Sequence, residues 1–209
     1  MCRWMAYSGS PVLLGLVILL AAPAVFAEPA KQTIVVVRHG EKPPKGLGQL
    51  TCQGLQRSLR LPAWLGERFP PPDAIYAPDP SVKATEIHGD GQRYDYVRPL
   101  VTIAPTAISL GLPVNTQLPF NDSGRLADEL LAERYRDATL YVAWEHLQIM
   151  NFAQVVLRRL NSGAEVPDWP NSDYDTVFVF HISWHANPEV RFEVLQQEYG
   201  GLPETCPVP

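Results

Sequence analysis

A histidine between an arginine and a glycine is the feature of this sequence best suited to chemistry. The four residues Arg38-His39-Gly40-Glu41 follow a run of β-branched residues. An imidazole can attack phosphorus as a nucleophile, and a neighbouring guanidinium can hold phosphoryl oxygens through paired, charge-assisted hydrogen bonds. Gly40 would allow a close backbone approach. The residues therefore suggest phosphoryl transfer, although they would also suit a loop with a solvent-facing histidine.

The strands expected before His39 and His146 would bring these two side chains to one edge of a sheet. Thr33–Val37 is a β-branched run that predicts a buried strand, and Thr139–Trp144 predicts a second one. Ligands of open α/β sheets bind beyond the carboxyl ends of the strands. His39 and His146, two of the five histidines, follow directly after these strands. Both are therefore candidate site residues.

The remaining pattern alternates between helices and strands. Thr51 is a plausible N-cap for a helix that reaches about Phe69, and Pro62 is expected to kink or split it. Further elements are expected at 74–76, 98–110, 122–135, 139–144, the helix after it, 176–182 and 190–194. This alternation predicts an α/β domain over 28–209 with a mostly parallel sheet and antiparallel pairing at the last hairpin.

Several motifs together resemble the histidine phosphatase superfamily, in its first, phosphoglycerate-mutase-like branch. They occur in the family's order and at its spacing: Val37-Arg-His-Gly-Glu-Lys-Pro43, Leu50-Thr-Cys-Gln-Gly54, Arg98 with Thr102 and Gly111-Leu-Pro-Val114, and Val142-Ala-Trp-Glu-His146. The last has the W-E-H form seen in some secreted bacterial members. The resemblance covers residues 33 to about 160.

This resemblance implies a three-layer α/β sandwich, with a mostly parallel sheet and helices on both faces. It implies that His39 takes the phosphoryl group and that Arg38, Arg98 and His146 bind the substrate. Water would then hydrolyse the phosphohistidine. The resemblance implies no metal or other cofactor, because the guanidinium groups stabilise the charge that spreads over the phosphoryl oxygens.

Two assignments within this pattern stay open. Family members often place Ser-Pro-Leu directly before the second arginine, whereas here about twenty residues, 77–97, intervene. Arg98 is therefore the first choice for the second arginine, and Arg93 is the alternative. Asp122 occupies the place of the family's general acid, but it would also suit the N-cap of the next helix. Glu145 is the other candidate acid.

The other histidines give weaker signals. His181 and His185 are four residues apart, but a strand end is the wrong scaffold for that spacing, and acidic and cysteine residues do not cluster around them in the sequence. No metal site is therefore expected. His88 lies in the enlarged 77–97 loop, where it could line the substrate entrance or simply face solvent.

The first 27 residues have the layout of a secretory signal peptide. Arg3 precedes an apolar stretch of about a dozen residues, and Val25-Phe26-Ala27 offers small residues to a signal peptidase. The mature chain is then expected to begin at Glu28, to be periplasmic or secreted, and to have no membrane partner. An uncleaved membrane anchor is the alternative, although the stretch is short for a bilayer span.

The charge of the chain limits its partners. There are 17 Lys and Arg residues against 22 Asp and Glu residues, a net charge of −5, without a basic block that would bind nucleic acid. A small phosphate monoester would therefore have to be held by a local group of positive charges. Cys52 and Cys206 remain in the mature chain, either as a disulfide, which an oxidising compartment permits, or as two free thiols.

The function expected from these observations is hydrolysis of phosphate monoesters by an exported enzyme. A catalytically silent protein of the same fold that binds phosphate esters is the alternative from another class. A phosphomutase fits less well, because its sugar-phosphate substrates are normally cytoplasmic. Measurement of phosphate release would separate the three.

Overall fold

The protein was analysed as a computed structural model, which describes residues 1–2 and 28–207. The expected signal peptide, residues 1–27, lies outside the described residues except for its first two. No helix among the described residues is long and apolar enough to cross a membrane.

Thirteen short elements make up the described chain. The strands are β1 (Ala30–Arg38), β2 (Ala74–Tyr76), β3 (Ala84–Thr85), β4 (Arg93–Tyr94), β5 (Val114–Asn115), β6 (Thr139–Trp144), β7 (Thr176–Trp184) and β8 (Glu189–Gln196). The helices are α1 (Cys52–Gly66), α2 (Arg98–Leu110), α3 (Ser123–Leu130), the short 3₁₀ helix η1 (Glu133–Tyr135) and α4 (His146–Arg159).

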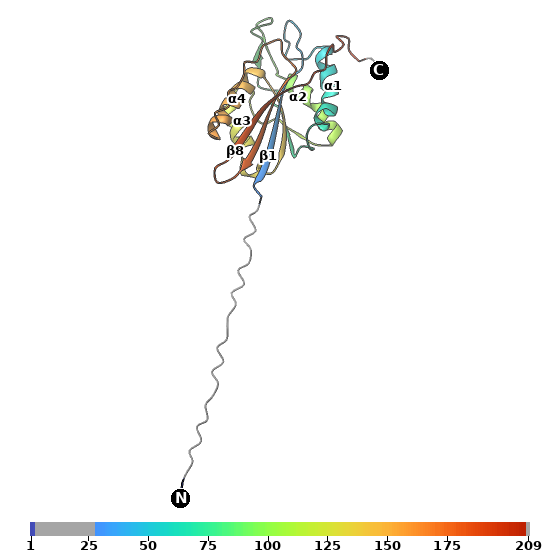
Figure 1. Cartoon of the computed structure of the whole chain (residues 1–209). Helices are drawn as coiled ribbons and strands as arrows, with labels where there is room; N and C mark the ends of the chain where they lie inside the picture. The colour runs from blue at the N-terminus through green and yellow to red at the C-terminus, as the bar shows by residue number, and fades with distance from the viewer. Residues whose placement is uncertain (3–27, 208–209) are drawn as a thin grey trace.

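Six strands form one sheet in the order β5-β2-β6-β1-β7-β8 (Figure 1). The three pairings from β5 to β1 are parallel. β7 runs antiparallel both to β1 and to β8, so antiparallel pairing begins one strand earlier than the last hairpin. β1 and β6 are adjacent and parallel, which brings their carboxyl ends to the same edge of the sheet.

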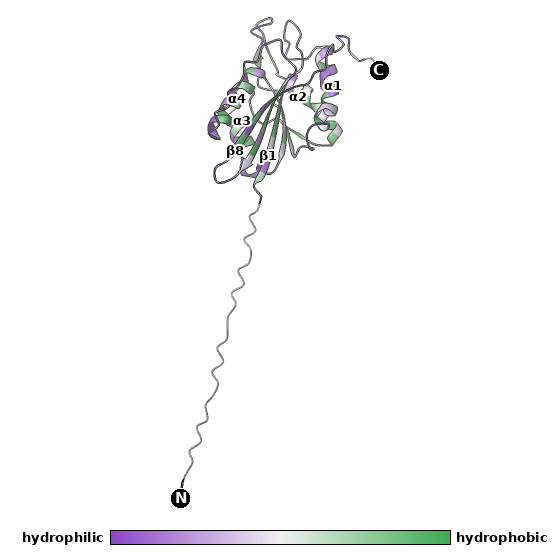
Figure 2. Cartoon of the chain, viewed as in Figure 1, coloured by the Kyte–Doolittle hydropathy of each residue, from purple (hydrophilic) through white to green (hydrophobic). Residues whose placement is uncertain are grey.

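Helices cover both faces of this sheet, as Figure 1 shows. Alternate residues of β1 point to opposite faces. Ile34 and Val36 pack in a core with α3 and α4, while Val35 and Val37 pack in a second core with α1 and α2. The strands are accordingly among the most hydrophobic parts of the chain (Figure 2). The expected three-layer α/β sandwich is confirmed.

Pro62 does not split the helix that carries it. α1 runs as a single helix from Cys52 to Gly66 with Pro62 inside it, so the helix is not split. Leu61, Trp64 and Leu65 on the same helix are buried in the second core, and this packing holds the helix together around the missing backbone hydrogen bond. The expected N-cap is confirmed, because Thr51 Oγ1 accepts from the Gly54 N–H at 3.1 Å.

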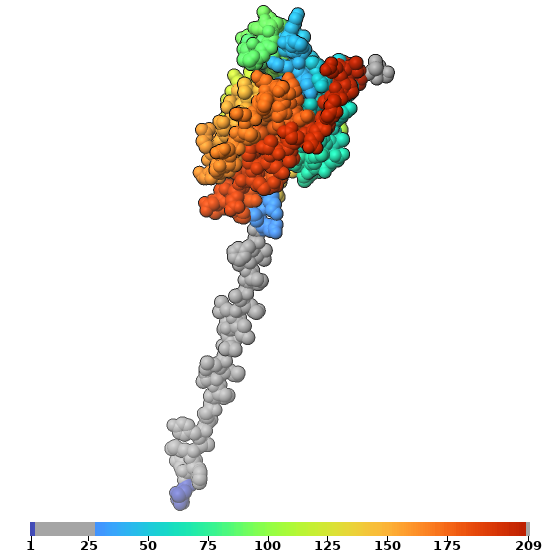
Figure 3. All heavy atoms as spheres, turned by 45° about the horizontal axis from the view of Figure 1, so that its top comes forward, coloured from blue at the N-terminus to red at the C-terminus, as the bar shows by residue number. Residues whose placement is uncertain are grey.

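The C-terminal segment is fastened to the start of α1. Cys52 and Cys206 form a disulfide, with their Cα atoms 4.4 Å apart. The red C-terminal segment lies against the cyan beginning of α1 in Figure 3. Gln56 also donates to the carbonyl of Thr205 at 3.2 Å. The disulfide reading of the two cysteines is therefore the correct one.

Removing this disulfide is expected to destabilise the protein strongly. The cross-link spans a sequence separation of 154 residues, and in the chain-entropy view such a loop contributes on the order of 3–5 kcal/mol by restricting the unfolded chain. Urea unfolding should show this loss for Cys52→Ser and Cys206→Ser alike, and the double variant should lose no more than either. Two free thiols titrated in the denatured, unreduced protein would contradict the disulfide.

Candidate active site

The edge of the sheet at the carboxyl ends of β1 and β6 carries the candidate chemistry. Arg38 pairs in register with Trp144, and the N–H of His39 donates to the Trp144 carbonyl at 3.0 Å. Glu145 and His146 follow at once on β6. The neighbouring strands therefore deliver an Arg-His pair and a Glu-His pair to one place.

A cavity of about 280 Å³ opens at this edge. Its lining comes from the end of β1 and the loop after it, the end of β6, the start of α4, the 77–97 loop, the first residue of α2, and the loops before α3 and β7. The lining residues are Arg38, His39, Lys42, Ala84, Thr85, Glu86, Ile87, His88, Tyr96, Arg98, Phe120, Glu145, His146, Leu147, Gln148 and Asn171. Arg38, His39, Arg98 and His146, the four residues expected to hold a phosphate, are therefore brought together.

The imidazole of His39 is buried and set in one tautomer. Its Nδ1 lies 2.7 Å from the carbonyl oxygen of Gly40. A carbonyl only accepts, so Nδ1 carries the hydrogen and Nε2 carries a free lone pair. Burial, aided by the charges of Arg98 and Arg38, holds the pKa of His39 well below its usual 6.5. His39 is therefore neutral at pH 7, as a nucleophile must be.

The guanidinium of Arg38 is anchored by backbone alone. It donates to the carbonyls of Asp173 at 2.6 Å and Pro170 at 3.3 Å, and it lies 4.0 Å over the ring of Tyr174. Burial lowers the pKa of Arg38 from its ordinary value. Because none of the described carboxylates forms a salt bridge with it, its positive charge is left for a ligand.

Arg98, in contrast, is paired with a buried carboxylate. Its Nη1 donates to Oε1 of Glu86, which also accepts from the Gly48 N–H at 3.1 Å. Lys42 lies 3.5 Å from the other carboxylate oxygen. Although burial opposes ionisation of Glu86, these partners hold its pKa below its usual value. Glu86 therefore fixes Arg98 at the cavity wall.

His146 and Glu145 form the opposite wall. Nδ1 of His146 lies 2.6 Å from Oε1 of Glu145, but the two groups are not oriented for a good hydrogen bond, and Nε2 has no partner among the described residues. Glu145 also caps α4 by accepting from the Gln148 N–H at 2.9 Å. Burial raises the pKa of Glu145, yet His146 and the backbone donors bring it below the usual value. Glu145 is thus a partner of a histidine, not of an arginine.

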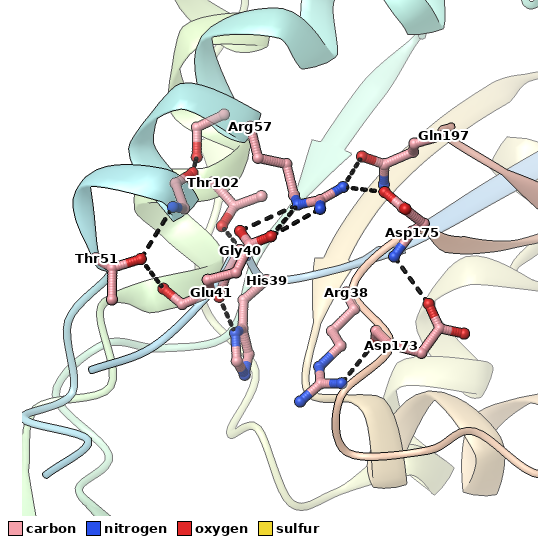
Figure 4. A network of polar contacts seen from close by, with 12 residues as sticks. Arg38, His39, Gly40, Glu41, Thr51, Arg57, Thr102, Asp173, Asp175 and Gln197 are labelled. Carbon is pink, nitrogen blue, oxygen red and sulfur yellow. Dashed lines mark hydrogen bonds and ion pairs between the residues drawn. The ribbon is translucent and has the colours of Figure 1, made fainter. Parts of the chain in front are cut away.

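A hydroxyl joins α2 to the His39 loop. Thr102 Oγ1 donates to the Arg98 carbonyl one helical turn earlier, at 2.8 Å. It also accepts from the Gly40 N–H at 2.9 Å (Figure 4). This contact explains the spacing of four between Arg98 and Thr102. A Cβ on Gly40 would come within 2.8 Å of the Gly54 carbonyl oxygen, so a glycine is needed where the loop crosses α1.

A buried ion pair holds the other side of this loop. Arg57 of α1 donates to both carboxylate oxygens of Glu41, with Nη2 to Oε1 at 2.7 Å (Figure 4). Its Nη1 reaches Asp175 at 2.5 Å and Gln197 at 3.0 Å. The residue after Gly40 is therefore fixed to α1 and, through Arg57, to the two ends of the β7–β8 hairpin.

Unpaired polar atoms gather around the cavity. The described residues contain eight buried side-chain nitrogen or oxygen atoms without a hydrogen-bond partner, and five of them belong to cavity-lining residues. The five are Arg38 Nε, Arg98 Nε, Tyr96 Oη and both ring nitrogens of His146. Buried polar atoms are normally paired, because desolvation without a partner costs about 1–3 kcal/mol each. Such a cluster indicates a site for a ligand rich in hydrogen-bond acceptors.

The other candidates lie elsewhere or play smaller roles. Arg93 is exposed on β4 and does not line the cavity. His88 does line it, at the exposed entrance. His181 contacts Glu193 at 3.3 Å, while His185 is exposed. No group of three or more possible metal ligands was found within the described part of the chain.

Asp122 does not line the cavity. Its carboxylate accepts from the Arg125 N–H at 3.0 Å and caps α3, which is the alternative role that the sequence allowed. Its neighbour Phe120 does line the cavity. Of the two candidate acids, only Glu145 is at the cavity wall.

Substitutions of Asp122 are therefore expected to affect stability and not the chemical step. Asp122→Ala should lower the free energy of unfolding by about 1 kcal/mol, whereas Asp122→Asn should keep most of it, because an amide oxygen also caps. Phosphate release from aryl and alkyl phosphates should change equally in Asp122→Asn. A rate that falls much more for the alkyl ester would instead assign the acid to Asp122.

Sequence reasoning missed several lining residues. Lys42 lies within the first motif, and Phe120 is two residues before Asp122, but neither was given a role. Glu86 and Gln148 belong to no motif, and no local pattern marks Glu86 as the partner of an arginine twelve positions away. Tyr96 lies in the enlarged 77–97 loop, but its burial and its contact with Phe120, at 4.9 Å between ring centroids, depend on the tertiary fold.

The comparisons agree on the fold. No protein-family model and no curated protein matches the sequence. A mycobacterial glucosyl-3-phosphoglycerate phosphatase matches with a TM-score of 0.52 and 15% identity, over 79% of this chain and 98% of that one. A Nakamurella multipartitia protein assigned as the phosphohistidine phosphatase SixA matches with a TM-score of 0.51 and 15% identity, over 81% and 98%.

A third structure, described as mycobacterial hydrolase 2, has a TM-score of 0.51 and 14% identity, over 79% of this chain and 91% of that one. At these identities the likeness concerns the fold. The chain shares its α/β fold with these three structures, and this is the fold that the motifs led us to expect.

Proposed function

We propose that the protein is an exported phosphatase that hydrolyses phosphate monoesters through a phosphohistidine on His39. The observation that carries this proposal is the cluster of five unpaired polar atoms around a cavity with two buried guanidiniums and a neutral histidine. A phosphoryl group offers acceptor oxygens and negative charge, so it would satisfy the donors that the folded protein leaves unpaired. The phosphatase activity of neighbours with the same fold supports the same class of reaction.

In the first step, Nε2 of His39 attacks phosphorus, a P–N bond forms, and the bond to the leaving oxygen breaks. The Nδ1–H bond to the Gly40 carbonyl keeps the lone pair on Nε2 and stabilises the positive charge that develops on the ring. Arg38 and Arg98 would bind the equatorial oxygens, where charge accumulates in the transition state.

The departing alkoxide needs a proton. We assign its delivery to the Glu145–His146 pair, because this pair lines the cavity and Asp122 does not. Nδ1 of His146 lies 2.6 Å from the Glu145 carboxylate, so one proton held between these two groups can pass to the leaving oxygen. In the second step water attacks phosphorus and gives a proton back to the Glu145–His146 pair, the P–N bond breaks, and inorganic phosphate and free His39 result.

Phosphate release from a panel of monoesters tests the proposal. A phosphatase releases inorganic phosphate from several of them, and release is lost in the His39→Ala variant. A phosphomutase would instead transfer the group between two positions of a sugar phosphate with little release. A silent binding protein would bind phosphate or vanadate without turnover, and that result would contradict the proposed hydrolysis.

Export is the part of the proposal that rests on residues 1–27 alone. The full-length protein, expressed in its native host, is expected to be cut after Ala27, so that the mature chain begins at Glu28 outside the cytoplasm. Mass spectrometry of the purified protein checks the new N-terminus, and Ala27→Phe, which places a bulky side chain at the cleavage site, should block processing. A wild-type protein that still carries residues 1–27 would overturn this expectation.

A further inference from the structure

The cavity changes character between its floor and its entrance. All its Arg, Lys, Asp and Glu side chains are buried or half-buried. The exposed part of the lining contains none of these residues. It consists of Thr85, Ile87, His88, Leu147 and Asn171. A charged group on the far side of a substrate would therefore find no ionic partner of opposite charge at the entrance, apart from His88 when protonated.

Two large aliphatic side chains are held open to solvent at this entrance. Ile87 is 74% exposed and Leu147 is 50% exposed. Single exposed hydrophobic residues are common and need no explanation. These two differ because they come from separate elements and line the same cavity, with the ring of Phe120 also part of its wall.

Both side chains are attached to anchored backbone. Ile87 follows the buried Glu86, and its N–H donates to the Thr85 carbonyl at 3.0 Å. The Glu86 carbonyl accepts from the Gly89 N–H at 2.8 Å. Leu147 lies in the first turn of α4, between His146 and the Gln148 N–H that Glu145 caps. An apolar group bound between them would meet a preformed surface, which limits the entropy lost on binding.

We infer that the alcohol part of the substrate is an uncharged, apolar alkyl or aryl group, held between Ile87, Leu147 and Phe120. This inference rests on the proposed function, which supplies the phosphate end of the ester. The phosphoryl group occupies the charged floor next to His39, and the carbon skeleton of the bound ester extends through the apolar entrance. Esters whose alcohol carries a carboxylate or ammonium group are then poor substrates.

A series of alkylphosphonates tests the inference without any need for turnover. Methyl-, propyl-, butyl- and hexylphosphonate present the same anion with increasing apolar length, and their affinity for the purified protein is measured by calorimetry. We expect the affinity to increase about two- to fourfold for each methylene, the upper value being that of complete burial. Aminohexylphosphonate, which ends in an ammonium group, should bind more weakly than hexylphosphonate.

Matched substitutions locate the effect. The ratio of hexyl- to methylphosphonate affinity should fall severalfold in Ile87→Ser and Leu147→Ser, and further in the double variant. Ile108→Ser is the control, because Ile108 is 78% exposed on α2 and does not line the cavity; its ratio should equal that of the wild type. Hexyl- and methylphosphonate carry the same phosphonate group, so any effect of a substitution on binding of that group cancels in the ratio of their affinities.

Three outcomes would overturn what is claimed, and they can be told apart. A flat series, with methyl- and hexylphosphonate bound equally, contradicts the apolar substrate and leaves the anion site standing. A chain-length dependence that survives in the double variant contradicts the assignment to Ile87 and Leu147. Failure to bind phosphate or any phosphonate contradicts the proposed function itself.

Discussion

Replacing His39 with alanine is expected to abolish phosphate release. Among the described residues, no other nucleophile is buried, fixed in one neutral tautomer and part of the same cavity as the guanidiniums of Arg38 and Arg98. Without the nucleophile the covalent intermediate cannot form, so the whole reaction path is lost and not only one contact that stabilises the transition state. Steady-state release measured with a nitrophenyl ester should fall to the rate of the uncatalysed control. His181→Ala, which changes a histidine outside the cavity, is the matched control and should stay active.

Rapid quenching tests the intermediate directly. Wild-type protein mixed with ³²P-labelled substrate should yield a label that is stable in base and lost in acid, as a phosphohistidine is, and His39→Ala should yield none. If the wild-type protein turns over normally without ever carrying this label, direct attack by water is the mechanism and His39 has another role. Circular dichroism of the variant shows whether the fold is retained.

Removal of Arg98 should have the second largest effect, on activity and stability together. Arg98→Ala is expected to lower kcat/KM. The decrease should correspond to roughly 2–4 kcal/mol of lost transition-state stabilisation, the range for loss of one preorganised donor. The substitution also leaves the carboxylate of Glu86, which is 2% exposed, with Lys42 as its remaining ionic partner. Breaking a buried ion pair in this way costs about 3–5 kcal/mol of folding stability.

A second substitution separates these two effects. In Arg98→Met combined with Glu86→Gln, both charges are gone, so urea unfolding should show most of the lost stability restored. Phosphate release should remain as slow as in Arg98→Ala, because no guanidinium binds the phosphoryl oxygens. Recovery of activity together with stability would mean that Arg98 supports the fold and does not act on the substrate.

Much of the candidate site could be predicted because it is attached to the regular part of the fold. His39 and His146 follow buried strands, and a parallel arrangement places the ends of such strands at one edge. Local chemistry was equally readable at Thr51, whose hydroxyl caps the helix that follows it. The spacing between Arg98 and Thr102 corresponds to one helical turn. It therefore matches the family's spacing, although the loop before Arg98 is about twenty residues longer than in many family members.

What could not be predicted depends on contacts across the chain. Glu86 acts through partners at Lys42, Gly48 and Arg98, and no local periodicity links these positions. Asp122 fitted two roles, since the carboxylate suits a cap and an acid equally, and only the position of the cavity distinguishes them. Pro62 lacks the N–H that a helix interior uses, yet burial of its neighbours keeps α1 in one piece, and burial of that kind cannot be read from α1 alone.

The order of strands in the sheet has a consequence for how the chain reaches this state. β1 is the first strand to be synthesised, but both of its neighbours come from the second half of the chain: Thr33 pairs with Thr139 on one side and with His181 on the other. Pairings so distant in sequence form slowly, because the entropy cost of closing a long loop comes before any stabilising contact is made. The central strand therefore has no partner until β6, about 100 residues further along the chain, has been made, and its second edge stays open for about 40 residues more, until β7 follows. A nascent chain of this topology cannot complete its central sheet before β7 and β8, close to its C-terminus, have been synthesised.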